Sequence, residues 1–212
     1  MLTDPSQMRH SYHSDGLRLS DTLDDPVQQF DQWFRVAVDS DVMEPNAMAL
    51  ATADAQGVPS VRMVLLKEFS AQGFVFYTNY ASRKADEIAA NGRVSLMFWW
   101  DRLYRQVRIE GTIAKNSPED SDAYFASRPH GSRIGALASQ QSRVLADRAE
   151  LETAWLALEQ RYPDEVPRPD HWGGYVVTPS RFEFWQGQRS RLHDRVIYNL
   201  AGGVWQKSRL AP

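Results

Sequence analysis

The chain has 212 residues, of which 42% are hydrophobic and 24% are charged, a composition typical of a globular protein that buries its own core. It contains no cysteine, which excludes disulfides and thiolate catalysis and favours a cytoplasmic location. A formal net charge of −3 argues against nonspecific binding to nucleic acid, because such binding needs a broad basic face. No apolar segment is long enough for a signal peptide or a membrane span, so we expect no membrane partner.

The start of the chain differs in composition from the rest. Residues 1–24 are polar and lack a hydrophobic period, so we expect a flexible N-terminal arm. Residues 25–212 contain no repeat, no low-complexity tract and no linker, and we predict a single domain there. Its first element should be a helix over residues 25–40, because Asp25 can cap that helix and Pro26 suits its first turn.

Extended segments rich in valine, isoleucine and aromatic residues make up most of this domain. The pattern predicts strands at residues 47–53, 58–67, 73–79, 93–100, 104–115, 175–185, 193–200 and 203–210. Further helices are expected at residues 81–91 behind Ser82, from Ser117 to just before Pro129, and at residues 143–162. Many short strands with few helices indicate a mainly β (α+β) fold, a β-barrel with peripheral helices.

Cationic side chains occur in places where strands usually lack them. Arg62 and Lys67 belong to the otherwise apolar strand VPSVRMVLLK. Because side chains alternate along a strand, their odd spacing sends them to opposite faces unless a bulge intervenes. Arg62 is therefore either solvated on the outer face of the sheet or part of an anion site with the cations that follow.

The segment YTNYASRK ends one strand and begins a helix. It places four polar residues near the positive end of the helix dipole: Thr78, Ser82, Arg83 and Lys84. These residues suit a phosphate, although a capped surface helix with two solvated cations would have the same sequence. Neither a G-x-G-x-x-G motif nor a Walker-type loop occurs, which argues against a dinucleotide on a Rossmann sheet and against a P-loop nucleotide. A mononucleotide is compatible with the sequence.

The segment DAYFASRPHGS supplies a second group of anion-binding side chains. Tyr124 and Arg128 lie four residues apart on one helical face, and Ser132 follows after a proline. A phenol, a guanidinium and a hydroxyl can hold a second phosphate through charge-assisted hydrogen bonds. Ordinary helix packing, with a C-terminal arginine near the negative end of the dipole, is the alternative.

Other residues are suited to a heterocyclic ligand. Gln106 and Gln141 can read the hydrogen-bonding edge of a ring and Trp185 can pack beside one, although core or surface roles fit these residue types equally well. The stretch RSRLHDR, residues 189–195, holds three arginines and a histidine. Within it Asp194 should orient a cation and not act as a base, because neighbouring positive charge keeps a carboxylate ionised.

Several long motifs follow one another along the chain: VRMVLLK, FYTNYASRK, YRQVRIEG, YFASRP, SRIGALASQQS, HWGGY, FEFWQGQRSRLHDR and the terminal SRLAP. From about Arg9 to Pro212 the pattern resembles the pyridoxamine 5′-phosphate oxidase family. The resemblance implies an FMN-binding split β-barrel with peripheral helices, and a homodimer with FMN at the subunit interface. Arg133 and Leu137 stand where relatives commonly carry glutamine and tryptophan, and neither departure removes an implied phosphate or flavin contact.

The resemblance also implies roles for individual residues. Those implied to bind FMN are Arg62, Met63, Val64, Leu65, Leu66, Lys67, Tyr77, Thr78, Arg83, Lys84, Gln106, Gln141, Ser142, Trp185 and Arg195. Those implied to bind the substrate are Arg9, Tyr12, Lys67, Tyr124, Arg128, Ser132, Arg191 and His193. Arg191 and His193 are the implied catalytic residues, facing the pyridine ring and the carbon that is oxidised. The charges of residues 189–195 would then be divided between substrate and flavin. No metal site is expected.

The implied activity is oxidation of pyridoxamine 5′-phosphate and pyridoxine 5′-phosphate to pyridoxal 5′-phosphate, with hydride transfer to FMN and reoxidation by dioxygen to hydrogen peroxide. Two alternatives stay open. A related flavin oxidase with another substrate, such as a phenazine-pathway enzyme, would lack part of the implied substrate set, of which Lys67, Tyr124, Arg128, Arg191 and His193 are all present. A noncatalytic binder of FMN or pyridoxal phosphate would be coloured but would consume no oxygen.

Overall fold

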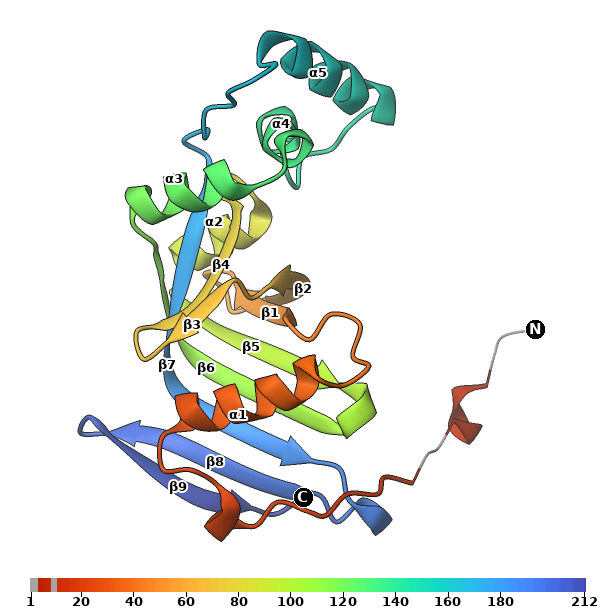
Figure 1. The fold of residues 1–212 in the computed structure, drawn as a ribbon, viewed down its shortest axis with the longest axis vertical. Coiled ribbons are helices and arrows are strands. Elements are labelled where there is room, and N and C mark those ends of the chain that lie inside the picture. The colour runs from red at the N-terminus through yellow and green to blue at the C-terminus, as the bar shows by residue number, and fades with distance from the viewer. Residues whose placement is uncertain (1–3, 9–10) are drawn as a thin grey trace. The chain divides into compact units, whose positions relative to one another are not determined.

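The computed structural model describes residues 4–8 and 11–212, and within them strands dominate (Figure 1). The strands are β1 (Ala47–Ala53), β2 (Pro59–Leu65), β3 (Glu68–Ser70), β4 (Gly73–Asn79), β5 (Arg93–Trp100), β6 (Arg105–Lys115), β7 (Trp172–Gln186), β8 (Asp194–Ala201) and β9 (Val204–Leu210). The α-helices are α1 (Pro26–Val38), α2 (Arg83–Ala90), α3 (Pro118–Ser127), α4 (His130–Ala138) and α5 (Arg148–Arg161). The mainly β architecture with attached helices is the one predicted.

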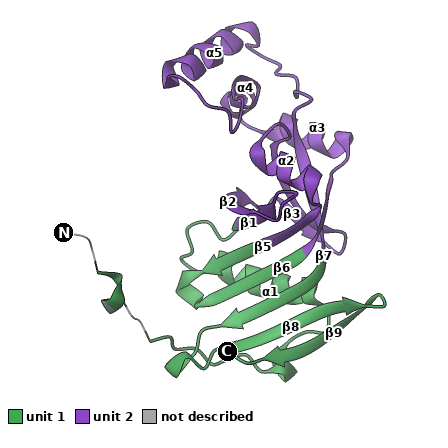
Figure 2. Cartoon of the chain, turned by 180° about the vertical axis from the view of Figure 1, so that it is seen from behind, with its two compact units in different colours: residues 1–48, 96–110, 180–212 green, residues 49–95, 111–179 purple. Residues whose placement is uncertain are grey.

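The described strands are hydrogen-bonded in the order β2-β1-β5-β6-β7-β4-β3, with β8 paired to β7 and β9 to β8. Contacts group the chain into two compact units, coloured separately in Figure 2. Unit 1 comprises residues 1–48, 96–110 and 180–212, and unit 2 comprises residues 49–95 and 111–179. The single domain expected over residues 25–212 stays a prediction.

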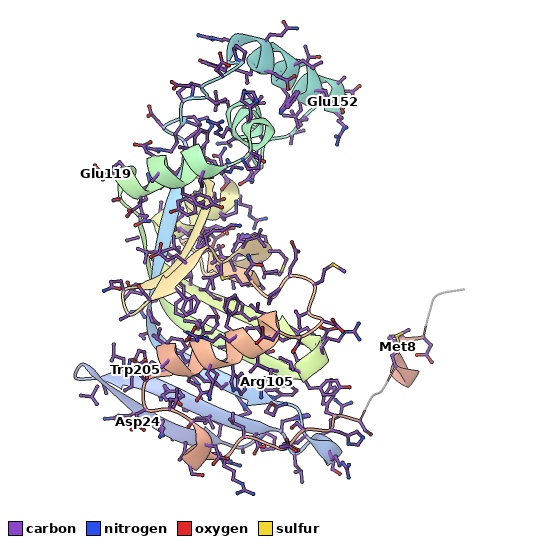
Figure 3. All side chains as sticks on the ribbon, viewed as in Figure 1. Met8, Asp24, Arg105, Glu119, Glu152 and Trp205 are labelled. Atoms are coloured by element: carbon purple, nitrogen blue, oxygen red, sulfur yellow. The ribbon has the colours of Figure 1, made fainter. Side chains whose placement is uncertain are left out.

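The core of unit 1 forms around α1. The Asp25 carboxylate accepts a hydrogen bond from Val27 N at 2.7 Å, so the helix begins where the sequence predicted. Phe30 is fully buried on this helix, and its ring centroid lies 5.0 Å from that of Phe98 in β5. The guanidinium of Arg105, labelled in Figure 3, lies 4.4 Å from the ring centroid of Trp33.

A hairpin closes unit 1. Strands β8 and β9 pair antiparallel from Arg195↔Leu210 to Ala201↔Val204. Gly202 and Gly203 both have positive φ, 58° and 80°, which the two central positions of a type I′ turn require. Residues of the arm contact this hairpin, since Tyr198 Oη donates to the carbonyl of Leu23 at 2.7 Å. The flexibility expected of residues 1–24 stays a prediction.

A small cluster in unit 2 holds helices α3 and α4. Its buried members are Phe125, Ile134, Val166 and Trp172. Strand β4 pairs antiparallel with the start of β7, with Thr78 opposite Gly173, which places the end of β4 beside this cluster. No helix in the described part of the chain combines the length and the apolar composition needed to cross a membrane.

Three elements differ from the sequence prediction. Helix α4 was not predicted because Gly131 and Gly135 lower its intrinsic propensity, and it is stabilised instead by the burial of Ile134. Helix α5 begins at Arg148 and not at residue 143, because the Asp147 side chain caps it by accepting from Ala149 N. Strand β3 was also missed, since its three residues are extended only through pairing with β4.

Candidate active site

A cavity of about 640 Å³ lies within unit 2. It is lined by residues of β2, β4, α2, α3, α4 and the start of β7. The implied FMN residues among its lining are Met63, Val64, Leu65, Lys67, Tyr77, Thr78, Lys84 and Gln141. The implied substrate residues among its lining are Lys67, Tyr124, Arg128 and Ser132. Members of both anion-binding groups identified in the sequence therefore line the same cavity: Thr78 and Lys84 of the first group, and Tyr124, Arg128 and Ser132 of the second.

Lys84 is the buried cation of this cavity. Its side chain is at the start of α2 and only 7% exposed, and Nζ donates to Gln141 Oε1 at 2.6 Å and to Ser82 Oγ at 3.0 Å. Burial, and then the nearby charge of Arg62, lower the pKa of Lys84 to about 8, while Glu87 opposes that change. A buried ammonium at a helix N-terminus suits an anionic ligand.

Arg62 and Arg83 do not line the cavity, because a buried carboxylate holds them. Glu87 Oε2 accepts from Arg62 Nη2 at 3.0 Å, and Glu87 Oε1 accepts from Arg83 Nε at 2.8 Å. Burial would raise the pKa of Glu87, but hydrogen bonds from Ser60, Thr52 and the two arginines outweigh it and lower that pKa to about 2. Glu87 is not among the residues predicted from the sequence, although its spacing of four from Arg83 on a helix indicates an ion pair.

Arg128 also belongs to the cavity lining and carries a buried donor that is unsatisfied among the described residues. Its guanidinium carbon lies 4.6 Å from the ring centroid of Trp172, and its Nη1 is buried with no hydrogen-bond partner among the described residues. Burial lowers the pKa of Arg128, and the charge of Tyr124 opposes this. Tyr124 in turn stacks on Tyr77, with ring centroids 3.8 Å apart. A buried donor without a protein acceptor fits a ligand that supplies one.

Unit 1 brings together three more of the implied substrate residues, Tyr12, Arg191 and His193. The Tyr12 ring centroid lies 5.7 Å from that of His193, and the Arg191 guanidinium carbon lies 5.9 Å from the Tyr12 ring. His193 Nδ1 accepts from the backbone N–H of Gln188 at 3.0 Å, so the neutral imidazole carries its proton on Nε2. Burial, and then Arg191, lower the pKa of His193. His193 is therefore neutral at neutral pH, with a donor at Nε2.

The backbone beside this group is strained. Ser190 and Arg191 have φ values of 55° and 63°, a left-handed conformation that residues other than glycine rarely adopt. They belong to a short 3-10 helix, Arg189–Arg191. This helix connects β7 to β8 and belongs to the charged segment of residues 189–195.

A second buried glutamate holds Arg195. Glu183 is 3% exposed and accepts from Arg195 Nε at 2.8 Å and from Arg195 Nη2 at 3.0 Å. Burial acts to raise the pKa of Glu183, yet the hydrogen bonds and charges of its arginines lower it. Trp185 pairs directly with Arg195 across the two strands, and its ring centroid lies 4.6 Å from that of His193. In unit 1, Trp185 therefore lies on β7, Arg195 lies on β8, and Arg191 and His193 lie on the segment that connects these two strands.

The remaining predicted residues lie elsewhere. Gln106 is half-buried on β6 in unit 1, Leu66 is buried outside the cavity lining, and Ser142 is exposed with φ of 73°. Arg9 lies outside the described residues. Asp194 orients a cation as predicted, because its Oδ1 accepts from Arg209 Nη1 at 2.8 Å.

Comparisons with known proteins identify the family. The family model described as Pyridoxamine 5′-phosphate oxidase matches residues 35–162, and the model of the Pyridoxine 5′-phosphate oxidase C-terminal dimerisation region matches residues 172–212. A pyridoxine/pyridoxamine 5′-phosphate oxidase of Paraburkholderia phymatum is 54% identical over 98% of this chain and 98% of its own length. The chain belongs to the pyridoxamine 5′-phosphate oxidase family. The relative of the same name from Thermosynechococcus vestitus is 53% identical over 100% of both chains.

Solved structures related to this oxidase family share the fold. PhzG from Burkholderia lata, in complex with tetrahydrophenazine-1-carboxylic acid, is 30% identical over 93% of this chain and 98% of its own, with a TM-score of 0.88. A pyridoxamine 5′-phosphate oxidase-related, FMN binding protein from Nostoc punctiforme covers 89% of this chain and 98% of its own at 16% identity, with a TM-score of 0.69. Membership of the oxidase family confirms the predicted split-barrel fold, the enzyme class and FMN as the cofactor. The roles of individual residues stay predictions.

Proposed function

We propose that this chain oxidises pyridoxamine 5′-phosphate and pyridoxine 5′-phosphate to pyridoxal 5′-phosphate in the cytoplasm, with dioxygen as the final acceptor and hydrogen peroxide as the second product. One observation supports the assignment most: Thr78 and Lys84 of the first predicted anion-binding group line a single cavity in unit 2 together with Tyr124, Arg128 and Ser132 of the second. One cavity with both groups suits two phosphorylated ligands held close together, and binding energy from the phosphates can then orient the reacting parts.

The lining around Lys84 fits the phosphate of FMN. This group holds a buried ammonium, and the hydroxyl of Thr78 and the amide of Gln141 lie within hydrogen-bonding distance of each other. Met63, Val64 and Leu65 line the same cavity. Bound FMN supplies a flavin that accepts a hydride, which no protein side chain can do. The chain itself supplies binding, orientation and a positive environment.

The lining around Arg128 fits the phosphate of the substrate. Among the described residues of the lining, Arg128 has a buried Nη1 without a protein acceptor, and Lys67, Tyr124 and Ser132 line the same cavity. Phosphate oxygens accept well from a guanidinium and from hydroxyl groups. We assign Arg128 the central role in binding the substrate phosphate.

We also propose roles for residues of unit 1 in a homodimer. The dimerisation region matched at residues 172–212 supports a homodimer. We propose that two copies share each site, with FMN at the subunit interface. Arg191 and the Nε2–H of His193 would donate hydrogen bonds to the substrate, Tyr12 would cover it, and Arg195 would stabilise negative charge on the reduced cofactor.

A substrate assay tests this function. The purified protein should show a flavin absorption spectrum, form an aldehyde from both phosphate esters, and release one hydrogen peroxide per dioxygen consumed. A coloured protein that consumes no oxygen with either ester would instead be a noncatalytic binder. Because PhzG shares the fold at 30% identity, a tetrahydrophenazine carboxylic acid belongs in the assay, and preference for it over both esters would contradict the proposal.

Binding of FMN should weaken as the pH is raised from about 7 to about 9.5. Burial and Arg62 lower the pKa of Lys84 to about 8, so this ammonium loses its proton within that range. A bound phosphate favours the protonated form, so binding above about pH 8 requires proton uptake. Fluorescence titration of the apoprotein with FMN measures the effect. Lys84→Arg keeps its charge and should show a flatter pH dependence, and identical pH profiles for the two proteins would contradict the role of Lys84.

A further inference from the structure

The most heavily hydrogen-bonded carboxylate near the cavity belongs to no implied binding set. Glu87 on α2 is 4% exposed and accepts four hydrogen bonds. The donors are the hydroxyls of Thr52 and Ser60 and the guanidinium groups of Arg62 and Arg83. They come from β1, β2 and α2, so this carboxylate joins three elements of unit 2.

Such a carboxylate is stable when buried only if it stays paired. Removal of a charge from water is costly, and here two guanidinium groups and two hydroxyls compensate that cost. Loss of one partner of a buried pair leaves the other partner misplaced or uncompensated. Glu87 and Arg62 therefore depend on each other.

Arg62 is held rigidly as a consequence. Its Nη1 donates to the carbonyl of Leu50 at 3.1 Å and to Thr52 Oγ1, and its Nη2 donates to Ser60 Oγ and to Glu87. These four hydrogen bonds fix the plane of the guanidinium. The charge of Arg62 also acts on Lys84, since it contributes to the lowered pKa of that lysine. Glu87 thus fixes the position of a positive charge that acts on Lys84, a residue of the cavity lining.

We propose that Glu87 is a positioning residue for the FMN phosphate: it holds Arg62 and Arg83 beside Lys84 and adjusts the local charge to that of the ligand. The proposal rests on the proposed function. Three cations, Arg62, Arg83 and Lys84, and one carboxylate, Glu87, give a formal local charge of +2. A phosphate monoester carries a charge of about −1.5 to −2 near pH 7, so the two nearly balance.

The change Glu87→Gln tests the proposal. The amide has nearly the same size, but it removes the negative charge and turns one acceptor oxygen into a donor that faces other donors. Arg62 and Arg83 then lose their fixed positions. Because the charges of Arg62 and Arg83 would no longer be held beside Lys84, we expect FMN to bind the apoprotein about 10-fold more weakly, which corresponds to about 1.4 kcal/mol. Riboflavin, which lacks the phosphate, should bind with unchanged affinity.

Fluorescence titrations of the apoprotein with FMN and with riboflavin, at one salt concentration, give the required readout. Glu152→Gln is the matched control, because Glu152 is an exposed glutamate on α5 (Figure 3) that pairs with Arg148 at 2.6 Å. This control should bind both ligands as the unaltered protein does. Circular dichroism and urea unfolding show that each variant is folded during the titration.

A double-mutant cycle separates positioning from general damage. If Glu87 acts through Arg62, Glu87→Gln should weaken FMN binding much less in an Arg62→Ala background than in the unaltered protein. Should Glu87→Gln fail to fold, Ser60→Ala removes one hydroxyl between Arg62 and Glu87, and a few-fold loss of affinity for FMN alone is expected.

Three results would overturn the proposal: equal losses for FMN and riboflavin, unchanged or tighter FMN binding by the Glu87 and Ser60 variants, or additive effects in the cycle. A wrong assignment of the proposed function would give a different experimental result. In that case the unaltered protein would itself fail to oxidise the two esters, whatever the Glu87 variants do.

Discussion

Replacement of Arg191 by alanine is expected to lower kcat about 100-fold or more, while the purified variant keeps its full FMN content. The magnitude corresponds to loss of one preorganised donor at a site of reaction. Arg191 is exposed in unit 1, beside Tyr12 and two residues before His193, and it is not among the described residues that line the cavity of unit 2. Its loss should therefore act on the bound substrate and leave the binding of the FMN phosphate intact.

Arg189→Ala is the matched control for this experiment. Arg189 belongs to the same 3-10 helix and carries the same charge, but its Nε donates to His13 Nδ1 at 2.7 Å. Steady-state rates with pyridoxamine 5′-phosphate, together with the flavin absorbance per chain, distinguish the two variants. If Arg191→Ala kept full turnover, or lost FMN in proportion to activity, our placement of Arg191 would be wrong.

Replacement of Arg128 by alanine should raise KM for pyridoxine 5′-phosphate roughly 100-fold. Truncation of one partner of a buried charge pair costs about 2–5 kcal/mol, and each 1.4 kcal/mol corresponds to a tenfold change. Within the described part of the chain Arg128 Nη1 is buried and has no acceptor, and the substrate phosphate is the partner that we propose the variant would lose. Arg128→Lys should restore the affinity only in part, because an ammonium lacks the planar fork and stacks poorly on Trp172.

Pyridoxine, which lacks the phosphate, distinguishes a loss of phosphate binding in Arg128→Ala from a general loss of activity. The ratio of kcat/KM for pyridoxine 5′-phosphate to that for pyridoxine should fall about 100-fold in Arg128→Ala, since the contact exists only with the ester. Arg161→Ala serves as the control, because Arg161 lies on α5 with its guanidinium 5.3 Å from the ring of Tyr162. If this ratio were unchanged in Arg128→Ala, residues other than Arg128 would bind the substrate phosphate.

Local chemistry made much of the fold predictable. Asp25 and Pro26 define the start of α1, and the adjacent glycines at 202 and 203 define the β8–β9 turn, because caps and turns depend on residues close in sequence. The elements that were missed depend on distant partners. Helix α4 is held by Ile134 in a cluster with Phe125 and Trp172, which its own glycine-bearing sequence does not reveal.

The sequence by itself determined the family and which cations are available to bind phosphates. Only the tertiary structure decided which of these cations face the cavity and which are held by buried carboxylates. Lys84 and Arg128 line the cavity, whereas Arg62 is held by Glu87 and Arg195 by Glu183. The reason is physical: a buried charge must find a partner close in space, and residues far apart in the chain supply it.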